Sequence, residues 1–454
     1  MTSLIQPNVF DDKRSDITDY ASLVEEDRVH VAVYTRPEIF DAEMERIFHK
    51  TWVFVGHDSE VPEPGDFRLR TIGKVPVIMV RDRKGEVHVM VNRCRHRGNA
   101  VCQVDQGNTN EFYCAYHGWT YDLDGRLASV TYPKAYGENF DPRALALARV
   151  ARVDAYQGFV FASLVEDVPD LKDHLAGAKA QLDLAASLSP TGKLSMRCGV
   201  QKFMYRGNWK FQIENGVDGY HPNFLHQSFF AMQRKYTGTN ITPMFTDDSS
   251  FTVRDLGNGH AMIDQRALRS LNSEREKKLA GKEIESQEAL SADMSSETSA
   301  PWERSYREAM VMGYGKDRAE EIIASGGTHL EVFPNLTVVE SNVRVVIPIA
   351  VDKTYVFMYP VLLEGAPAEK NALRLRRMAQ GGGAAGLVST DDNEIFERNQ
   401  VGLTGEAGGV PWLLLSRGLG RETSMNGERI GGMTDETSQR GIWRQWKKLM
   451  SRTG

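Results

Sequence analysis

The chain has 454 residues, of which 41% are hydrophobic and 26% charged, as expected of a water-soluble protein of two or three domains. A net charge of −6 argues against nucleic acid as the partner, because phosphate binding requires a basic surface. No apolar run is long enough to span a membrane, and residues 1–20 lack the apolar core of a secretory signal. Four cysteines do not make a disulfide framework in so long a chain, so we expect a cytoplasmic protein without membrane association.

The first part of the chain is predicted to form a short N-terminal segment followed by a β domain. Residues 1–50 make up the N-terminal segment, and apolar side chains at helical spacing predict a helix over 38–52. Alternating patterns then predict strands at 52–56, 75–80, 86–91 and 158–162. The Arg83-Lys84-Gly85 sequence predicts a hairpin turn between two of them. We therefore expect a small antiparallel domain over 51–167.

Two short motifs within this β domain carry metal-binding side chains. They read Cys94-Arg95-His96-Arg97-Gly98 and Cys114-Ala115-Tyr116-His117-Gly118-Trp119. Each motif supplies one thiolate and one imidazole. Zinc can take two of each, but its usual sites place both cysteines on one arm and both histidines on the other. Two motifs that each carry one Cys and one His suit a [2Fe–2S] cluster with two Cys on one iron and two His on the other. A zinc-stabilised binding module remains the alternative at this point.

Residues 168–454 predict a larger second domain that mixes helices with a meander of strands. Its predicted helices cover 171–188, 208–230, 366–378, 387–400 and 436–450. Its predicted strands cover 196–205, 331–333, 336–340, 343–349 and 354–362. The polar stretch 267–300 is expected to be a solvated helix with a loop, or alternatively a lid over a site.

A second group of metal-binding residues lies in the segment 208–226. Asp218 and His221 are i,i+3 neighbours on a helix, whereas His221 and His226 would lie about 140° apart on an ideal one. Pro222 removes a backbone donor between the histidines, so we expect an irregular helix that lets both imidazoles reach one ion. Two histidines and one carboxylate form the facial triad of non-haem Fe(II) oxygenases.

Both motifs resemble those of the α subunits of Rieske non-haem iron aromatic-ring-hydroxylating dioxygenases. That family reads Cys-x-His-Arg-Gly, then Cys-x-x-His-Gly-Trp, then Glu-Asn-x-x-Asp-x-Tyr-His-x-x-x-x-His, which begins here at Glu214. It also has a late Asp-Asp-x-Glu stretch, matched by 391–394, whose second Asp is the third iron ligand. This selects Asp392 over Asp391 and Glu394.

The resemblance implies a role for each matched residue. The cluster ligands are Cys94, His96, Cys114 and His117, and the iron ligands are His221, His226 and Asp392. Asp218 is implied to link His221 to the cluster ligand His117 of a neighbouring subunit, where it would orient both imidazoles and shorten the electron path. Asn215 is either a wall of the pocket near the iron or a packing residue.

The family's fold and partners follow as expectations. The fold is α+β, a Rieske β domain plus a helix-grip catalytic domain with a curved antiparallel sheet. Gly381–Gly386 lacks the Gly-x-Gly-x-x-Gly order, so NAD(P)H and flavin chemistry must lie in another protein. The resemblance implies a flavin reductase, with or without a ferredoxin, that reduces the cluster. The oligomer is expected to be α₃, or α₃β₃ with a small β subunit.

Substrate and reaction are less defined by the resemblance. Glu-Asn-Gly-Val-Asp-Gly-Tyr-His is closest to benzoate-type members, which favours cis-dihydroxylation of an aromatic carboxylate with O₂. The end of the chain is more similar to the naphthalene and salicylate branches, so a polycyclic hydrocarbon dioxygenase and a salicylate-type monohydroxylase remain alternatives. A Rieske electron carrier is the alternative outside enzymes. Three further residues were considered: Cys102 and Cys198 are expected to be buried packing residues, and His329 is a weaker candidate for the pocket.

Overall fold

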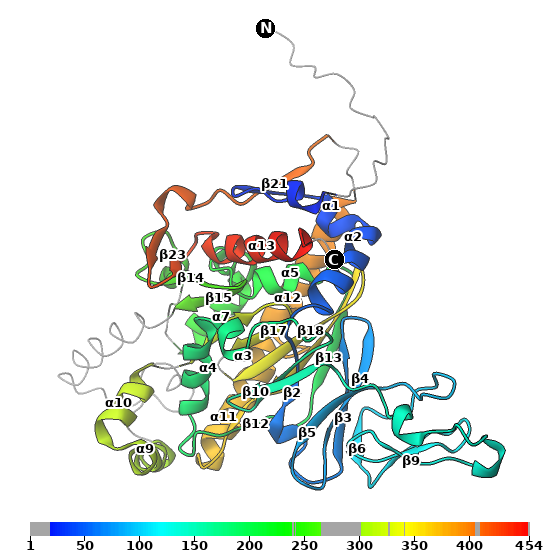
Figure 1. Cartoon of the computed structure of the whole chain (residues 1–454). Helices are drawn as coiled ribbons and strands as arrows, with labels where there is room; N and C mark the ends of the chain where they lie inside the picture. The colour runs from blue at the N-terminus through cyan, green and yellow to red at the C-terminus, as the bar shows by residue number, and fades with distance from the viewer. Residues whose placement is uncertain are drawn as a thin grey trace.

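The computed structural model describes residues 19–237, 240, 242–264, 301–325, 327–339, 341–404 and 409–452. These residues combine helices with antiparallel sheets, which confirms the expected α+β class (Figure 1). Within these ranges, every helix is too short or too polar to cross a bilayer. The stretch 267–300, predicted as a solvated helix and loop or a lid, lies outside the described residues.

The N-terminal segment packs against helices from the middle and the end of the chain. The elements concerned are a 3₁₀ turn (Tyr20–Leu23), β1 (Arg28–His30), α1 (Ala32–Thr35), α2 (Pro37–Glu43), a π turn (Met44–Phe48), α5 (Lys210–Asn215) and α13 (Thr437–Met450). The helix predicted over 38–52 thus ends at Phe48. Buried Glu43 accepts hydrogen bonds from the indoles of Trp209 (2.8 Å) and Trp446 (2.7 Å). It also pairs with buried Lys210 at 2.6 Å, so one carboxylate joins all three segments.

The next part of the chain forms three small antiparallel sheets. Their strands are β2 (Val53–His57), β3 (Asp66–Ile72), β4 (Val75–Arg81), β5 (Val87–Val91), β6 (Gln106–Asn108), β7 (Phe112–Tyr113), β8 (Thr120–Tyr121), β9 (Leu127–Ser129), β10 (Arg152–Tyr156) and β11 (Phe159–Ser163). The sheet orders are β5-β4-β3-β6, β7-β8-β9 and β10-β11-β2. The hairpin turn is confirmed, because Gly85 N–H donates to the Asp82 carbonyl between β4 and β5. Strands β3 and β10 and the short strands β6 to β9 were not predicted.

A long antiparallel sheet organises the second half of the described chain. Its strands are β13 (Gln201–Tyr205), β14 (Thr252–Gly257), β15 (His260–Asp264), β16 (His329–Val332), β17 (Leu336–Val339), β18 (Asn342–Ala350), β19 (Lys353–Pro360), β22 (Thr423–Met425) and β23 (Glu428–Gly432). The order is β13-β19-β18-β17-β16-β15-β14-β23-β22. The predicted meander is confirmed as β16 to β19. Two short pairs complete the strands, β1 with β21 (Trp412–Leu414) and β12 (Leu194–Ser195) with β20 (Leu362–Leu363).

Helices cover both faces of this sheet. The remaining ones are α3 (Leu171–Leu175), α4 (Ala178–Ser187), α6 (Pro222–Leu225), α7 (Gln227–Thr237), α9 (Pro301–Tyr314), α10 (Lys316–Ser325), α11 (Ala368–Arg377) with a π turn (Met378–Gly382), and α12 (Leu387–Leu403). Helices α5, α12 and α13 lie together on one side, and α4, α9, α10 and α11 lie towards the other (Figure 1).

Strand alternation assigns each side chain of the meander to one of these faces. The apolar set that packs with α3 and α4 in one buried cluster is Leu330, Val332, Leu336, Val338, Val343 and Val345. The intervening residues Glu331, Thr337 and Arg344 therefore face the opposite side. Register places these three in one row, because Glu331 pairs with Thr337 and Thr337 with Arg344. This row of polar side chains lies on the face that α5 and α12 cover.

Candidate metal centres

The two Cys-His motifs form matching turns at neighbouring loop tips. Cys94 O accepts from Gly98 N–H, and Cys114 O accepts from Gly118 N–H, each at 2.9 Å. Both glycines adopt positive φ, +74° and +72°, which an L side chain rarely adopts. The matching geometry of the two turns explains why each motif carries Gly at the fourth position after its Cys, as Gly98 and Gly118.

The thiols of these turns are buried and polarised. Cys94 is 3% exposed and Cys114 is 1% exposed, and both are free of disulfides. Tyr121 OH lies 3.2 Å from Cys94 Sγ, and Asn99 Nδ2 donates to Cys114 Sγ at 3.7 Å. Burial alone would raise the pKa of Cys114, but the Tyr116 N–H and further hydrogen bonds outweigh it and lower that pKa. A lowered pKa favours the thiolate, the form that binds metal.

The imidazoles of the same turns lie side by side nearer the surface. The rings of His96 and His117 have centroids 4.5 Å apart, and Trp119 stacks on His96 at 5.0 Å. His96 Nδ1 is buried and has no hydrogen-bond partner among the described residues. Buried thiols, adjacent imidazoles and an orphaned ring nitrogen fit the donor set of a Rieske cluster.

Two cysteines outside the motifs behave differently from each other. Cys102 is buried, and its Sγ lies 3.5 Å from the Val104 carbonyl, which confirms a packing role. Cys198 is exposed, so the expectation that it is buried is wrong. It follows the short strand β12 in a loop, and a loop leaves little apolar surface to cover a side chain.

The segment predicted as one helix over 208–230 is broken into α5, α6 and α7. Helix α5 ends at Asn215, His221 immediately precedes α6, and His226 lies between α6 and α7. Pro222 is the first residue of α6, where its missing N–H costs no hydrogen bond. The break confirms the irregular helix that the spacing of the two histidines required.

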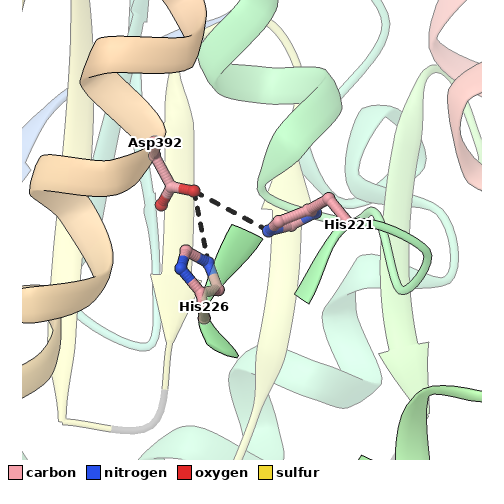
Figure 2. Close-up of side chains that lie close together, drawn as sticks. All are labelled: His221, His226 and Asp392. Atoms are coloured by element: carbon pink, nitrogen blue, oxygen red, sulfur yellow. Dashed lines mark ion pairs between the residues drawn. The ribbon is translucent and has the colours of Figure 1, made fainter. Parts of the chain in front are cut away.

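This break lets both imidazoles point at one carboxylate, as Figure 2 shows. Asp392 Oδ1 lies 3.7 Å from His221 Nε2 and 3.3 Å from His226 Nε2. The candidate ligand atoms of these three residues lie within 4.8 Å of one another. Asp392 and His226 are buried, and His226 Nε2 has no satisfactory hydrogen bond among the described residues. Two imidazoles and one carboxylate converging in this way fit a 2-His-1-carboxylate iron site.

The neighbouring acids of α12 take other positions. Asp391 Oδ2 lies 3.3 Å from His226 Nδ1, on the side of the ring away from Asp392. Glu394 is paired with Arg398 at 2.8 Å at the surface. Asp391 can therefore orient the His226 ring, whereas Asp392 alone of these acids meets both histidines.

Asn215 and Asp218 both contact the candidate site. Asn215 Nδ2 lies 3.3 Å from Asp392 Oδ1 and 3.3 Å from His221 Nε2. Asp218 Oδ2 lies 3.6 Å from His221 Nδ1, and its Oδ1 accepts the Tyr220 N–H at 2.5 Å. Burial would raise the pKa of Asp218, but its bond to His221 and the backbone donors outweigh burial and lower that pKa. Asp218 is therefore a carboxylate held in its ionised form at ion-pair distance from the far nitrogen of His221.

His329, on β16, supports the site from the sheet rather than joining the triad. Its Nε2–H donates to the Gly216 carbonyl at 2.5 Å, directly after α5. Burial, aided by the Arg344 cation, lowers the pKa of His329 to about 4, so the ring is neutral. His329 thus fixes the backbone beside Asn215.

Sequence reasoning did not identify two charged residues on the same face of the sheet, Glu331 and Arg344. Glu331 is fully buried, and burial raises the pKa of its carboxyl well above the ordinary value, although Thr337 OH donates to it at 2.7 Å. Arg344 is 8% exposed on β18. The sequence does contain an indication of Arg344, because it is a single charged residue inside the apolar run Val343-Arg344-Val345-Val346-Ile347.

Comparisons with known proteins agree with both centres. Residues 51–151 match the Rieske [2Fe-2S] domain, and residues 184–432 match the catalytic domain of the ring hydroxylating alpha subunit. The chain is 33% identical to the large subunit of anthranilate 1,2-dioxygenase from Acinetobacter baylyi, over 89% of this chain and 83% of that protein. It is 31% identical to the α subunit of toluate 1,2-dioxygenase from Pseudomonas putida, over 85% and 82% of the two chains. The solved structure of naphthalene 1,2-dioxygenase from Rhodococcus sp. bound to indole superposes with a TM-score of 0.74 at 26% identity, covering 93% of this chain and 94% of that one.

Proposed function

This chain belongs to the family of ring-hydroxylating dioxygenase α subunits, and on that premise we propose that it cis-dihydroxylates an aromatic carboxylate. Both atoms of O₂ are added to adjacent ring carbons, and two electrons come from a separate NAD(P)H-linked protein. The observation that carries the proposal is the approach of His221 and His226 to one oxygen of Asp392. A Rieske electron carrier would have no use for this second centre.

We assign the metal-binding roles to the residues already placed. The family carries a Rieske [2Fe–2S] cluster and a mononuclear non-haem iron. The cluster would be held by Cys94, Cys114, His96 and His117, and the iron by His221, His226 and Asp392. When bound, the cluster supplies single electrons and the iron supplies the chemistry of O₂.

The other polar residues have supporting roles in this proposal. Asp218 lies at ion-pair distance from His221 Nδ1, and Asp391 accepts from His226 Nδ1, so that both rings are held with Nε2 towards Asp392. Asn215 places an amide beside Asp392 and forms part of the wall where substrate would approach. We further propose that Asp218 links His221 to His117 of a neighbouring subunit.

The substrate class rests on the curated relatives. Anthranilate and toluate are aromatic carboxylates, and the proteins named for them are similar over most of both chains. A polycyclic hydrocarbon dioxygenase is the second candidate, favoured by the likeness to naphthalene 1,2-dioxygenase. A salicylate-type monohydroxylase is the third, and its product would carry one new hydroxyl rather than a cis-diol.

The partners and division of the chain belong to the same proposal. A flavin reductase, with or without a ferredoxin, reduces the cluster. The oligomer is α₃ or α₃β₃. Residues 1–50 form a segment packed on the catalytic part, residues 51–167 the Rieske domain and residues 168–454 the catalytic domain.

Product analysis tests the proposed reaction. The purified chain, with a matched reductase, NADH and O₂, is incubated with benzoate, anthranilate, salicylate and naphthalene in turn. We expect a cis-dihydrodiol, or its rearomatised catechol, from a carboxylate, with both oxygens derived from ¹⁸O₂. Conversion of naphthalene alone would contradict the carboxylate assignment, and a single labelled oxygen would indicate monohydroxylation.

Metal analysis tests the two centres independently of turnover. The proposal requires about three irons and two acid-labile sulfides per chain, two irons for the cluster and one for the facial triad. A preparation that binds zinc in place of the cluster would be colourless and would contradict it.

A further inference from the structure

Arg344 is a buried cation for which the described part of the chain provides no ion-pair partner. Its side chain belongs to the row Glu331–Thr337–Arg344 on the face of the sheet beneath α5 and α12. Its residue exposure of 8% places it more than nine-tenths buried. Its Nε has no hydrogen-bond partner among the described residues, and no carboxylate of those residues lies within ion-pair distance of its guanidinium.

Arg344 lies on the same face of the sheet as the residues proposed to bind iron. The Gly382 backbone, in the turn that leads into α12, is close enough that a Cβ there would lie 3.3 Å from Arg344 Nη2. Gly216, directly after α5, lies over the same row, because a Cβ there would be 3.3 Å from Glu331 Oε2. Asp392 and Glu331 are the acidic side chains whose charge, when ionised, would raise the pKa of Arg344. The guanidinium therefore lies beside the turn that leads into α12, in the same row of side chains that the residue after α5 contacts at Glu331.

The charge of this region favours an anionic ligand. Burial raises the pKa of Glu331 and so disfavours its charged form, which makes that carboxyl a poor counter-charge for Arg344. Asp218 and Asp391 lie against the far ring nitrogens of His221 and His226, so neither of these carboxylates pairs with the guanidinium. A buried, unpaired guanidinium is costly, and a carboxylate that fits its planar donors in bidentate geometry removes that cost.

We propose that Arg344 binds the carboxylate of the substrate and directs its aromatic ring towards the triad. This inference rests on the proposed function and names the residue that selects aromatic acids over hydrocarbons. The alternative is a purely structural charge, placed to stabilise Glu331 and Asp392, which would not distinguish one substrate from another.

Binding of a matched pair of ligands tests the proposal. Benzoate and benzamide have nearly the same shape, but only benzoate carries a charge. Their dissociation constants are measured by calorimetry with the iron-loaded wild type, Arg344→Gln and Arg344→Lys, together with iron content and melting temperature. For Arg344→Gln we expect benzoate affinity to fall about 30-fold or more and benzamide affinity to change less than threefold. Arg344→Lys keeps the positive charge but lacks the planar guanidinium that binds a carboxylate through two donors, so it should recover part of the benzoate affinity.

A second strand arginine provides the control. Arg254 lies on β14 of the same sheet but is already paired with Asp264 at 2.8 Å and with Glu428 at 3.1 Å. Arg254→Gln should leave the benzoate-to-benzamide ratio unchanged. An unchanged benzoate-to-benzamide ratio in a folded Arg344→Gln, whether both affinities fall equally or neither falls, would overturn the assignment of Arg344, as would an equal loss of both ligands in Arg344→Lys. If the wild type itself binds naphthalene and neither benzoate nor other aromatic acids, the carboxylate function fails instead.

Discussion

The residues around each metal centre are of two kinds: those whose side chains would bind the metal, and those that hold the metal-binding side chains in place. Asp392 faces both histidines, whereas Asp391 contacts only the far nitrogen of His226 at 3.3 Å. Loss of a metal ligand and loss of the residue that orients a ligand have different consequences. Removal of an orienting residue lowers the metal affinity by about 10–100-fold but leaves all the ligands in place.

The adjacent acids therefore provide a sharp comparison. We expect Asp392→Asn to keep the cluster, to lose the third iron and to lose more than about 100-fold in activity. Asp391→Asn should keep that iron with about 10-fold weaker affinity. Iron and sulfide analysis with metal titration measures both variants. Loss of iron in Asp391→Asn with retention in Asp392→Asn would reverse the ligand assignment.

A second prediction concerns Tyr121, beside the cluster ligand Cys94. Its hydroxyl accepts from Arg95 N–H at 3.0 Å and lies 3.2 Å from Cys94 Sγ, so its own proton is directed at the sulfur. Burial raises the pKa of Tyr121, which keeps that donor protonated. A hydrogen bond to sulfur stabilises the reduced cluster. Tyr121→Phe should thus lower the reduction potential by about 20–60 mV, equivalent to one net hydrogen bond. A redox titration followed by circular dichroism measures it, and an unchanged potential would contradict the assigned donor.

At the scale of elements, buried histidines connect the sheet to the helices. His260, on β15, is fully buried; its Nδ1 accepts the Phe333 N–H at 3.1 Å, and its Nε2–H donates to the His174 carbonyl at 2.8 Å. Both ring nitrogens are thus occupied in the neutral form. Burial lowers the pKa of His260 to about 4.

This shift predicts acid sensitivity. Between pH 6.5 and 4 the unfolded chain protonates His260 and the folded chain does not, so the free energy of unfolding falls as pH decreases across that window. The full shift corresponds to about 3 kcal/mol. His260→Gln should be less stable than the wild type at pH 7.5 and should lose less on acidification. Chemical denaturation at pH 7.5, 6 and 5 measures both slopes, and parallel slopes would contradict the prediction.

The elements also show how far sequence reasoning extends. The break after α5 could be predicted, because the spacing of His221 and His226 and the position of Pro222 are local. The approach of Asp392 could not be derived locally, since α12 reaches the histidines only through the order of the strands between them; the family motif alone selected it. Arg344 was missed for the same reason. Its charge was visible in an apolar run, but the face that it takes depends on which strands and helices pack together.

At the scale of the whole molecule, the two centres lie in different parts of one chain. Figure 1 shows β6, which follows the first cluster loop, and β9, which shares a sheet with the strands around the second, at one end, and α5 and α12 near the middle. Asp218, proposed to link the centres, contacts His221 in its own chain, and no contact between Asp218 and His117 is found among the described residues. The proposed trimer resolves this separation, because a head-to-tail ring brings the cluster of one subunit to the iron of the next.

Complementation between two inactive variants tests that arrangement. Cys114→Ser disables the cluster and Asp392→Asn disables the iron, so each variant alone should be inactive. Co-expressed with different tags and purified over both, mixed trimers have one junction where an intact cluster faces an intact iron. We therefore expect about one third of wild-type activity per trimer. Transfer within a single subunit predicts none, since no chain in the mixture has both centres. Activity near one third, lost when the same chains are purified separately, would place electron transfer across the subunit boundary.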